Sequence, residues 1–105
     1  MFEELNTKVI PEYRFHDKRR WRFDYALPEY KIAIEQEGAI WTQGRHTRGS
    51  GFAKDMDKYN TATSMGWSIL RFTPTQLKKE YLECLRIIEE TIKTKIKNYK
   101  WLTLM

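Results

Sequence analysis

Two short segments alternate between apolar and polar positions, which is typical of strands with one buried face. In residues 19–26 (RRWRFDYA), three aromatic side chains alternate with polar ones and are expected to share one face. In residues 31–37 (KIAIEQE), two isoleucines occupy alternate positions. The proline in residues 27–30 (LPEY) indicates a turn between the two segments. We therefore predict an antiparallel hairpin.

Helical spacing and short apolar runs predict the rest of the chain. The other expected elements are a helical turn over residues 2–8, a short strand over 13–15, a helix over 52–64, a strand over 67–72 and a helix over 74–97. The length of 105 residues suits a single domain, residues 1–105. This order of elements predicts an α/β fold in which helices flank a small mixed sheet.

Composition and charge exclude several classes of protein. The single cysteine, Cys84, rules out an intramolecular disulfide and a CxxC zinc or redox pair. No apolar run approaches the ~18–20 residues of a membrane span, so we expect no membrane partner. Glu3 and Glu4 stand where a secretory signal would be basic and then apolar, which favours the cytoplasm. The 19 Lys and Arg against 14 Asp and Glu give a net charge of +5, which suits a polyanionic partner.

The hairpin carries three carboxylates, on Asp24, Glu35 and Glu37. With the predicted turn, Ala26 pairs with Lys31, and Glu35 becomes a diagonal neighbour of Asp24 with Cβ atoms within ~8 Å. Carboxylates gathered in this way repel one another unless a cation lies between them, and their hard oxygen atoms suit Mg²⁺ or Mn²⁺. The alternative is a face exposed to water, on which neighbouring basic side chains neutralise the carboxylates.

These carboxylates lie in the segment WRFDYALPEYKIAIEQEGAIW, which is followed by a Gly/Arg/His loop, the helical segment KDMDKYN and GWSILRFT. This series of segments resembles the PD-(D/E)XK nuclease superfamily. More narrowly, it is similar to small phage and bacterial endonuclease domains of the very-short-patch-repair and Holliday-junction-resolvase-like type. The resemblance implies a restriction-endonuclease-like αβββαβ core with a shortened N-terminal helix, in the cytoplasm of a bacterial or phage-infected cell. The family's aspartate maps onto Asp24, and the first acidic residue of its E-x-K motif maps onto Glu35.

The chain departs from the family pattern in three places. Glu37 occupies the position of the E-x-K lysine, and we expect a basic residue of the next helix to replace it, first Lys58 and then Lys54. Gln36 stands where an apolar residue is usual, and its amide is expected on the face of the two isoleucines. The family's N-terminal helix often supplies another metal-orienting glutamate, for which three residues could substitute: Glu3, Glu4 and Glu12.

The resemblance implies an Mg²⁺-dependent deoxyribonuclease that hydrolyses phosphodiester bonds, with Mn²⁺ able to replace Mg²⁺. Asp24 and Glu35 would be metal ligands, and Glu37 a third ligand or a general base. Lys58 would orient the attacking water or stabilise the transition state. Two other readings stay open: a non-catalytic nucleic-acid-binding module that retains the nuclease fold, and a basic structural or inhibitor protein with surface carboxylates.

Basic residues on both sides of the acidic hairpin are the expected contacts to DNA phosphates. The residues assigned to DNA binding are Arg19, Arg20, Arg22, Arg45, His46, Arg48 and Lys54. Such contacts would position duplex or branched DNA without reading its sequence, and cleavage specific for junctions, mismatches or nicks is one form of the expected activity. Since a duplex needs two cuts, a homodimer is one arrangement that would supply both.

Overall fold

The computed structural model describes residues 1–37 and 50–104, with side-chain surroundings for residues 1–37 and 55–98. The elements in chain order are β1 (Ile10–Arg14), β2 (Arg22–Leu27), β3 (Ile32–Gln36), α1 (Ser50–Ser64), β4 (Ser68–Phe72), α2 (Pro74–Lys79) and α3 (Tyr81–Leu104). The strands form one sheet in the order β1-β2-β3-β4, antiparallel from β1 to β3 and parallel between β3 and β4. The predicted mixed α/β class is therefore confirmed.

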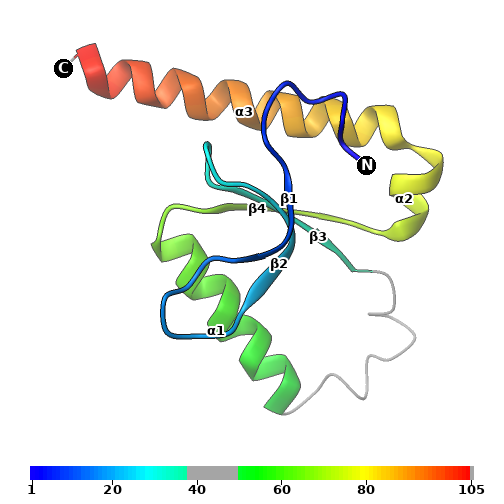
Figure 1. Ribbon diagram of the computed structural model, residues 1–105, viewed down its shortest axis with the longest axis vertical. Helices are drawn as coiled ribbons and strands as arrows, with labels where there is room; N and C mark the ends of the chain where they lie inside the picture. Colours follow the sequence, from blue (N-terminus) through cyan, green and yellow to red (C-terminus); the bar gives the residue numbers. More distant parts are fainter. Residues whose placement is uncertain (38–49, 105) are drawn as a thin grey trace.

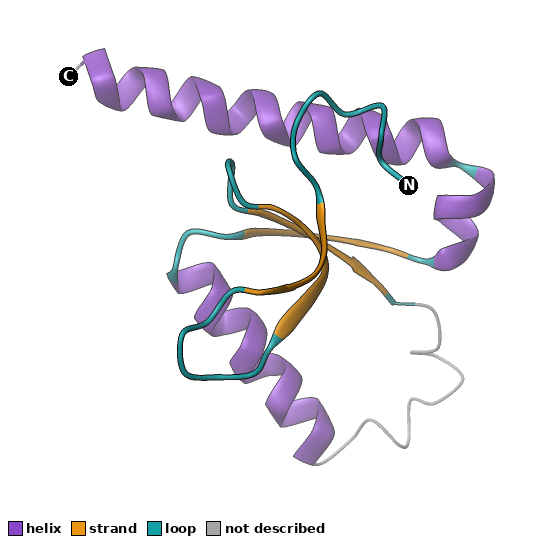
Figure 2. Cartoon of the chain, viewed as in Figure 1, coloured by secondary structure: helices purple, strands orange, loops and turns teal. Residues whose placement is uncertain are grey.

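Helices cover both faces of the sheet (Figures 1 and 2). On one face, α1 packs against a core formed by Phe15, Phe23, Ala26, Ala33, Ala62 and Trp67. On the other face, α2 and α3 pack against a core formed by Phe2, Leu5, Leu27, Ile32, Ile34, Phe72, Leu77, Cys84, Leu85 and Ile88. The fully buried alanines of the first core lie on both the strands and α1, and such small side chains let α1 approach the sheet closely.

The central hairpin forms as predicted, but its register is different. Ala26 pairs with Ala33 instead of Lys31, because the four-residue connecting loop comprises residues 28–31 rather than 27–30. Lys31 is the last residue of this loop and has a left-handed backbone conformation, with φ 53°. This conformation is uncommon for a residue other than glycine and could not be predicted from the sequence. Continuing the observed register by two residues places Asp24 directly opposite Glu35, rather than diagonal to it.

The alternation of side chains along β2 breaks at Asp24. Phe23 belongs to the core under α1, whereas Tyr25 packs against the core under α3, so the expectation that the aromatic residues of this strand share one face was wrong. On β1, Glu12 has φ 49°, and the β1–β2 pairing skips the Glu12–Asp24 position. The side-chain alternation of β2 is thus interrupted at Asp24, opposite the positive-φ residue Glu12 of β1.

The C-terminal helical region is two helices, not the single helix predicted. The side chain of Thr73 accepts the backbone N–H of Gln76 (3.0 Å), and the Gln76 side chain accepts the backbone N–H of Thr73 (2.8 Å), which forms a capping box at the start of α2. α2 ends at Glu80, whose non-helical backbone separates it from α3. No helix in residues 50–104 is both long and apolar enough to cross a membrane.

The N-terminal segment forms turns, and no helix precedes β1 in the described residues 1–37, so the expected shortened N-terminal helix is not observed. Phe2 is nevertheless buried, with its ring 5.1 Å from that of Tyr25. The backbone N–H of Phe2 donates to the hydroxyl of Tyr81 (2.6 Å). The segment therefore packs on the α3 side of the sheet, away from α1.

Candidate active site

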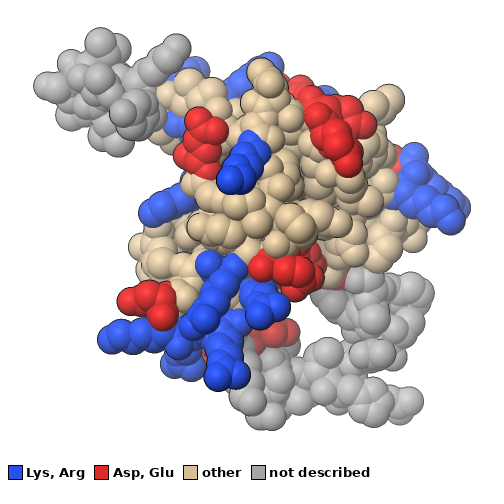
Figure 3. All heavy atoms as spheres, viewed as in Figure 1, with Lys and Arg blue, Asp and Glu red and all other residues tan. Residues whose placement is uncertain are grey.

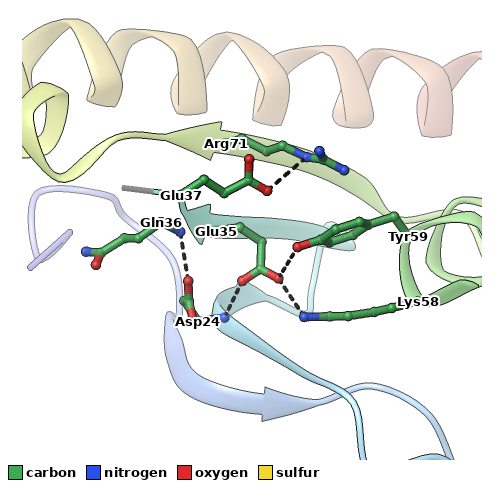
Figure 4. Close-up of polar contacts among 7 residues, drawn as sticks. All are labelled: Asp24, Glu35, Gln36, Glu37, Lys58, Tyr59 and Arg71. Atoms are coloured by element: carbon green, nitrogen blue, oxygen red, sulfur yellow. Dashed lines mark hydrogen bonds and ion pairs between the residues drawn. The ribbon is translucent and has the colours of Figure 1, made fainter. Parts of the chain in front are cut away.

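Asp24 and Glu35 bind across β2 and β3 through their side chains (Figure 4). The backbone N–H of Asp24 donates to Oε2 of Glu35 (2.8 Å), and the N–H of Gln36 donates to Oδ2 of Asp24 (2.7 Å). Carboxylate oxygens thus take the place of backbone carbonyls at this end of the strand pair. Because each carboxylate accepts a hydrogen bond from the opposite strand, both side chains are held in fixed positions. The side chain of Gln36 is exposed, so the expectation of a buried amide there was wrong.

α1 contributes two hydrogen-bond donors to the carboxylate of Glu35. Lys58 Nζ lies 2.7 Å from Oε1 of Glu35, and the hydroxyl of Tyr59 donates to the same oxygen at 3.2 Å. The sequence predicted that Lys58 would reach the sheet, and this placement agrees with that expectation. Its part in catalysis stays a prediction.

The environment of Glu35 is largely closed to water. Its side chain is 4% exposed, and that of Lys58 is 15% exposed. Lys58 Nζ also lies 5.6 Å from the ring centroid of Phe23 and 5.2 Å from that of Tyr59. Burial raises the pKa of Glu35 above its ordinary value, although the hydrogen bond from Lys58 and the N–H of Asp24 act in the opposite direction. Burial, and then the negative charge of Glu35, raise the pKa of Tyr59.

Glu37 does not join the Asp24–Glu35 pair by any hydrogen bond among the described residues. Its Oε1 instead lies 3.5 Å from Nε of Arg71 on β4. The guanidinium of Arg71 lies over the ring of Tyr59, with Cζ 4.1 Å from the ring centroid. The expected roles of Glu37 as a third ligand or general base therefore stay predictions, and the observed contact is an ion pair.

Asp24 and Glu35 offer carboxylate oxygens, the type of ligand that a divalent cation such as Mg²⁺ prefers. Among the described residues, no group of three or more His, Cys, Asp and Glu side chains is close enough to hold a metal ion. Mg²⁺ is, however, usually bound by one or two protein carboxylates together with water and substrate phosphate. A carboxylate has about four lone-pair sites. Counting only bonds from the described residues, Asp24 uses one of them and Glu35 uses three, which leaves acceptor sites on both carboxylates.

The three glutamates considered as substitutes lie in different places. Glu3 binds the N-terminal ammonium (2.6 Å), and Glu4 accepts the hydroxyl of Tyr81 (2.7 Å), both on the α3 side of the sheet. Glu12 lies on β1 at the position opposite Asp24, between two pairs of the β1–β2 register. Glu12 is therefore the one of the three that the fold places next to the carboxylate pair.

Three of the predicted DNA contacts lie on or beside the β1–β2 loop, residues 15–21: Arg19 and Arg20 on the loop, and Arg22 at the start of β2. Arg19, Arg20 and Arg22 are exposed, and the guanidinium of Arg19 lies 5.0 Å from the ring centroid of Trp21. Figure 3 shows Lys and Arg side chains gathered where this loop lies, with Asp and Glu side chains beside them. The other predicted contacts fall outside the residues or side chains that the structure describes: Arg45, His46, Arg48 and Lys54.

Tyr59 and Arg71 were not predicted as site residues. Tyr59 directly follows Lys58 on α1, which was the available signal. Arg71 alternates with Ile69, which packs on the α1 side of the sheet, and pairs in register with Glu35. That pairing joins residues far apart in the sequence, so no local pattern could have revealed it.

No protein-family model, curated protein or solved structure matches this chain. The likeness to PD-(D/E)XK nucleases therefore stays a prediction that rests on the residues and their geometry.

Proposed function

We propose that the protein is a metal-dependent DNA endonuclease of the restriction-endonuclease-like fold. The observation that carries this proposal is the convergence of Asp24, Glu35 and Lys58: two carboxylates meet across one strand pair, and an ammonium lies 2.7 Å from one of them. Hydrolysis of a phosphodiester needs anionic ligands for a cation and a positive group near the developing charge. The cluster supplies both from rigid elements.

Each residue has a defined part in this proposal. Asp24 and Glu35 would hold Mg²⁺, for which Mn²⁺ could substitute. Such a cation would supply a water of lowered pKa and positive charge to balance the phosphate. Lys58 orients the attacking water or stabilises negative charge on the phosphate oxygens. Tyr59 holds Glu35 in place through its hydroxyl and is a positioning residue.

The burial of Glu35 is consistent with this assignment. A carboxylate whose pKa is raised by burial gains from a cation that favours its ionised form. Groups whose pKa is shifted by burial and a charged partner gather at functional sites more often than elsewhere, although buried ion pairs in structural networks are shifted too. The 2.7 Å contact with Lys58 alone would fit either case, and the cleavage assay separates them.

Incubation of the purified protein with supercoiled plasmid, linear duplex and four-way-junction DNA tests the proposal. We expect cleavage with Mg²⁺ or Mn²⁺ and none with EDTA. Asp24→Asn should reduce cleavage by at least ~100-fold, the scale lost when a key charge of a catalytic site is removed. The amide oxygen introduced at position 24 can still accept the N–H of Gln36, so the fold should persist.

Glu89→Gln is the matched charge control, because Glu89 is exposed on α3, on the other side of the sheet. It should cleave like the unmodified protein. Full cleavage by Asp24→Asn, with an unchanged circular dichroism spectrum and melting temperature, would contradict the endonuclease proposal.

A non-catalytic nucleic-acid-binding module is the second candidate. It is favoured by the direct ion pair between Lys58 and Glu35, because each partner already neutralises the other without a cation. DNA binding that weakens steeply with salt, together with no cleavage on any of the three substrates with either metal, would support this candidate instead.

A further inference from the structure

We infer that Arg71 forms a phosphate-binding subsite beside the Asp24–Glu35 pair, and that Glu37 orients this arginine and competes with the phosphate for it. The ligand is a backbone phosphate a few nucleotides from the one that is cleaved, on the same DNA strand. The inference rests on the proposed action on DNA. The experiment below can reject the Arg71 subsite without rejecting the endonuclease, and the endonuclease without rejecting the subsite.

The position of Arg71 follows from the sheet. Glu35 and Arg71 are register partners on the parallel strands β3 and β4, and Asp24 continues the row on β2. With neighbouring strands ~4.8 Å apart, Arg71 begins about 10 Å from Asp24, measured across two strand spacings. A DNA strand carries one phosphate per ~3.4 Å of helix rise, so a strand that enters the carboxylate site passes Arg71 within a few nucleotides.

The guanidinium of Arg71 is held in a fixed orientation. It lies over the ring of Tyr59, at 4.1 Å from the centroid, and the hydroxyl of the same tyrosine donates to Glu35. Tyr59 therefore links the orientation of Arg71 to that of the candidate metal ligand. An arginine restrained by stacking loses less freedom when it binds a phosphate with two parallel N–H groups.

The donors of Arg71 are largely unused among the described residues. Within residues 1–37 and 55–98, its single charged contact is from Nε to Glu37 at 3.5 Å, beyond the usual range of a strong charge-assisted hydrogen bond. The Arg71 side chain is 47% exposed and that of Glu37 is 20% exposed. By contrast, Arg86 on α3 makes three hydrogen bonds to Glu83, at 2.7 to 3.1 Å. In the part of the chain whose side chains are described, the terminal amino groups of Arg71 have no hydrogen-bond or ion-pair partner, so they can bind an incoming anion.

Fluorescence anisotropy with a fluorescein-labelled DNA duplex in EDTA tests the inference, because binding is then measured without cleavage. Arg71→Ala should weaken binding by about tenfold and lower the slope of log affinity against log salt by about one. Arg71→Lys should restore the slope but only part of the affinity, because an ammonium keeps the charge and loses the planar fork. Glu37→Gln should strengthen binding a few-fold, because it removes the competing carboxylate.

Opposite effects of Arg71→Ala and Glu37→Gln on DNA affinity distinguish the subsite from a structural ion pair. If Arg71 only anchored Glu37, both substitutions would lower the melting temperature and neither would change the salt slope. Arg86→Ala is the matched control, since it removes an exposed arginine paired with a glutamate on the opposite side of the sheet. It should leave the slope unchanged.

Three results would overturn the inference: an unchanged slope for Arg71→Ala, the same change in Arg86→Ala, or no salt-dependent binding by the unmodified protein. Loss of affinity in Arg71→Ala, in a protein that cleaves no DNA, would retain the subsite and reject the endonuclease. If metal-dependent cleavage requires Asp24, but Arg71→Ala changes neither cleavage nor binding, the endonuclease proposal is retained and the subsite is rejected.

Discussion

Replacing Lys58 with methionine perturbs the candidate site most directly. Methionine is unbranched, has a similar length and is a strong helix former, so the packing and helix propensity of α1 change little. The substitution removes the ammonium partner of Glu35, whose side chain is 4% exposed. The free energy of unfolding at neutral pH should fall because the buried carboxylate loses its compensating charge.

The magnitude follows from what remains around Glu35. Removing one partner of a buried ion pair costs about 3–5 kcal/mol. The Asp24 N–H and the Tyr59 hydroxyl keep two of the three hydrogen bonds of Glu35, so we expect the lower limit, ~3 kcal/mol. That is roughly a 150-fold change in the ratio of folded to unfolded protein. For a domain of this size it corresponds to about 12 °C or more in melting temperature.

Urea unfolding in EDTA, followed by tryptophan fluorescence at several pH values, measures this loss. The pKa of Glu35 is already raised by burial, and removal of Lys58 raises it further, so Glu35 takes up a proton as the pH falls. The deficit of Lys58→Met should therefore shrink toward acid pH. The double substitution Glu35→Gln with Lys58→Met removes both charges and should recover most of the loss.

Lys93→Met provides the matched control. Lys93 forms an exposed ion pair with Glu90 on α3, at 3.6 Å, and its loss should cost less than about 1 kcal/mol. A loss below that figure for Lys58→Met, independent of pH, would refute the description of Lys58 and Glu35 as a buried, mutually dependent pair.

Three further predictions concern stability and the basic loop. Burial raises the pKa of Glu35, so between its unfolded and folded pKa values the folded state binds more protons than the unfolded chain, and the free energy of unfolding should fall as the pH rises through the raised pKa. Urea titrations in EDTA from about pH 4 to 8 should show this fall in the unmodified protein and not in Glu35→Gln. Thr73→Ala should cost ~1 kcal/mol of unfolding free energy through loss of the capping box, whereas Thr73→Ser should cost much less. His16 Nδ1 accepts the backbone N–H groups of Lys18 (3.1 Å) and Arg19 (2.9 Å), so His16→Ala should weaken DNA binding in the anisotropy assay and His16→Asn, which retains an acceptor, should weaken it less.

Local patterns were enough to predict the mixed fold and the two central strands. The alternation in KIAIEQE and the helical spacing after residue 50 are local properties of the chain, and both elements form where expected within a few residues. The register of the hairpin was not predictable in this way. It depends on Lys31 adopting a positive φ, which is tolerated because its Nζ donates to the carbonyl of Met65 and its own carbonyl accepts the N–H of Ser68.

The same holds for the candidate site: some of its residues could be predicted from local sequence, and others depend on contacts between distant parts of the chain. Asp24 and Glu35 could be placed together from the hairpin alone, and Lys58 could be placed on the inner side of a helix from its spacing. The pairing of Arg71 with Glu35 could not, because it depends on the parallel contact between β3 and β4. The ion pair between Glu37 and Arg71 therefore depends on long-range strand pairing.

The charges of the completed cluster bear on how the proposed endonuclease would engage its substrate. With Glu35 ionised, Asp24, Glu35 and Glu37 carry three negative charges, and Lys58 and Arg71 carry two positive charges, which leaves one negative charge. A phosphodiester adds another, and a partly desolvated site cannot hold two uncompensated anions without a large cost. One divalent cation balances this sum, and it is needed only when the phosphate is present. On this reasoning, DNA and Mg²⁺ should each increase the affinity of the protein for the other, and a cation affinity that is unchanged by DNA would argue against it.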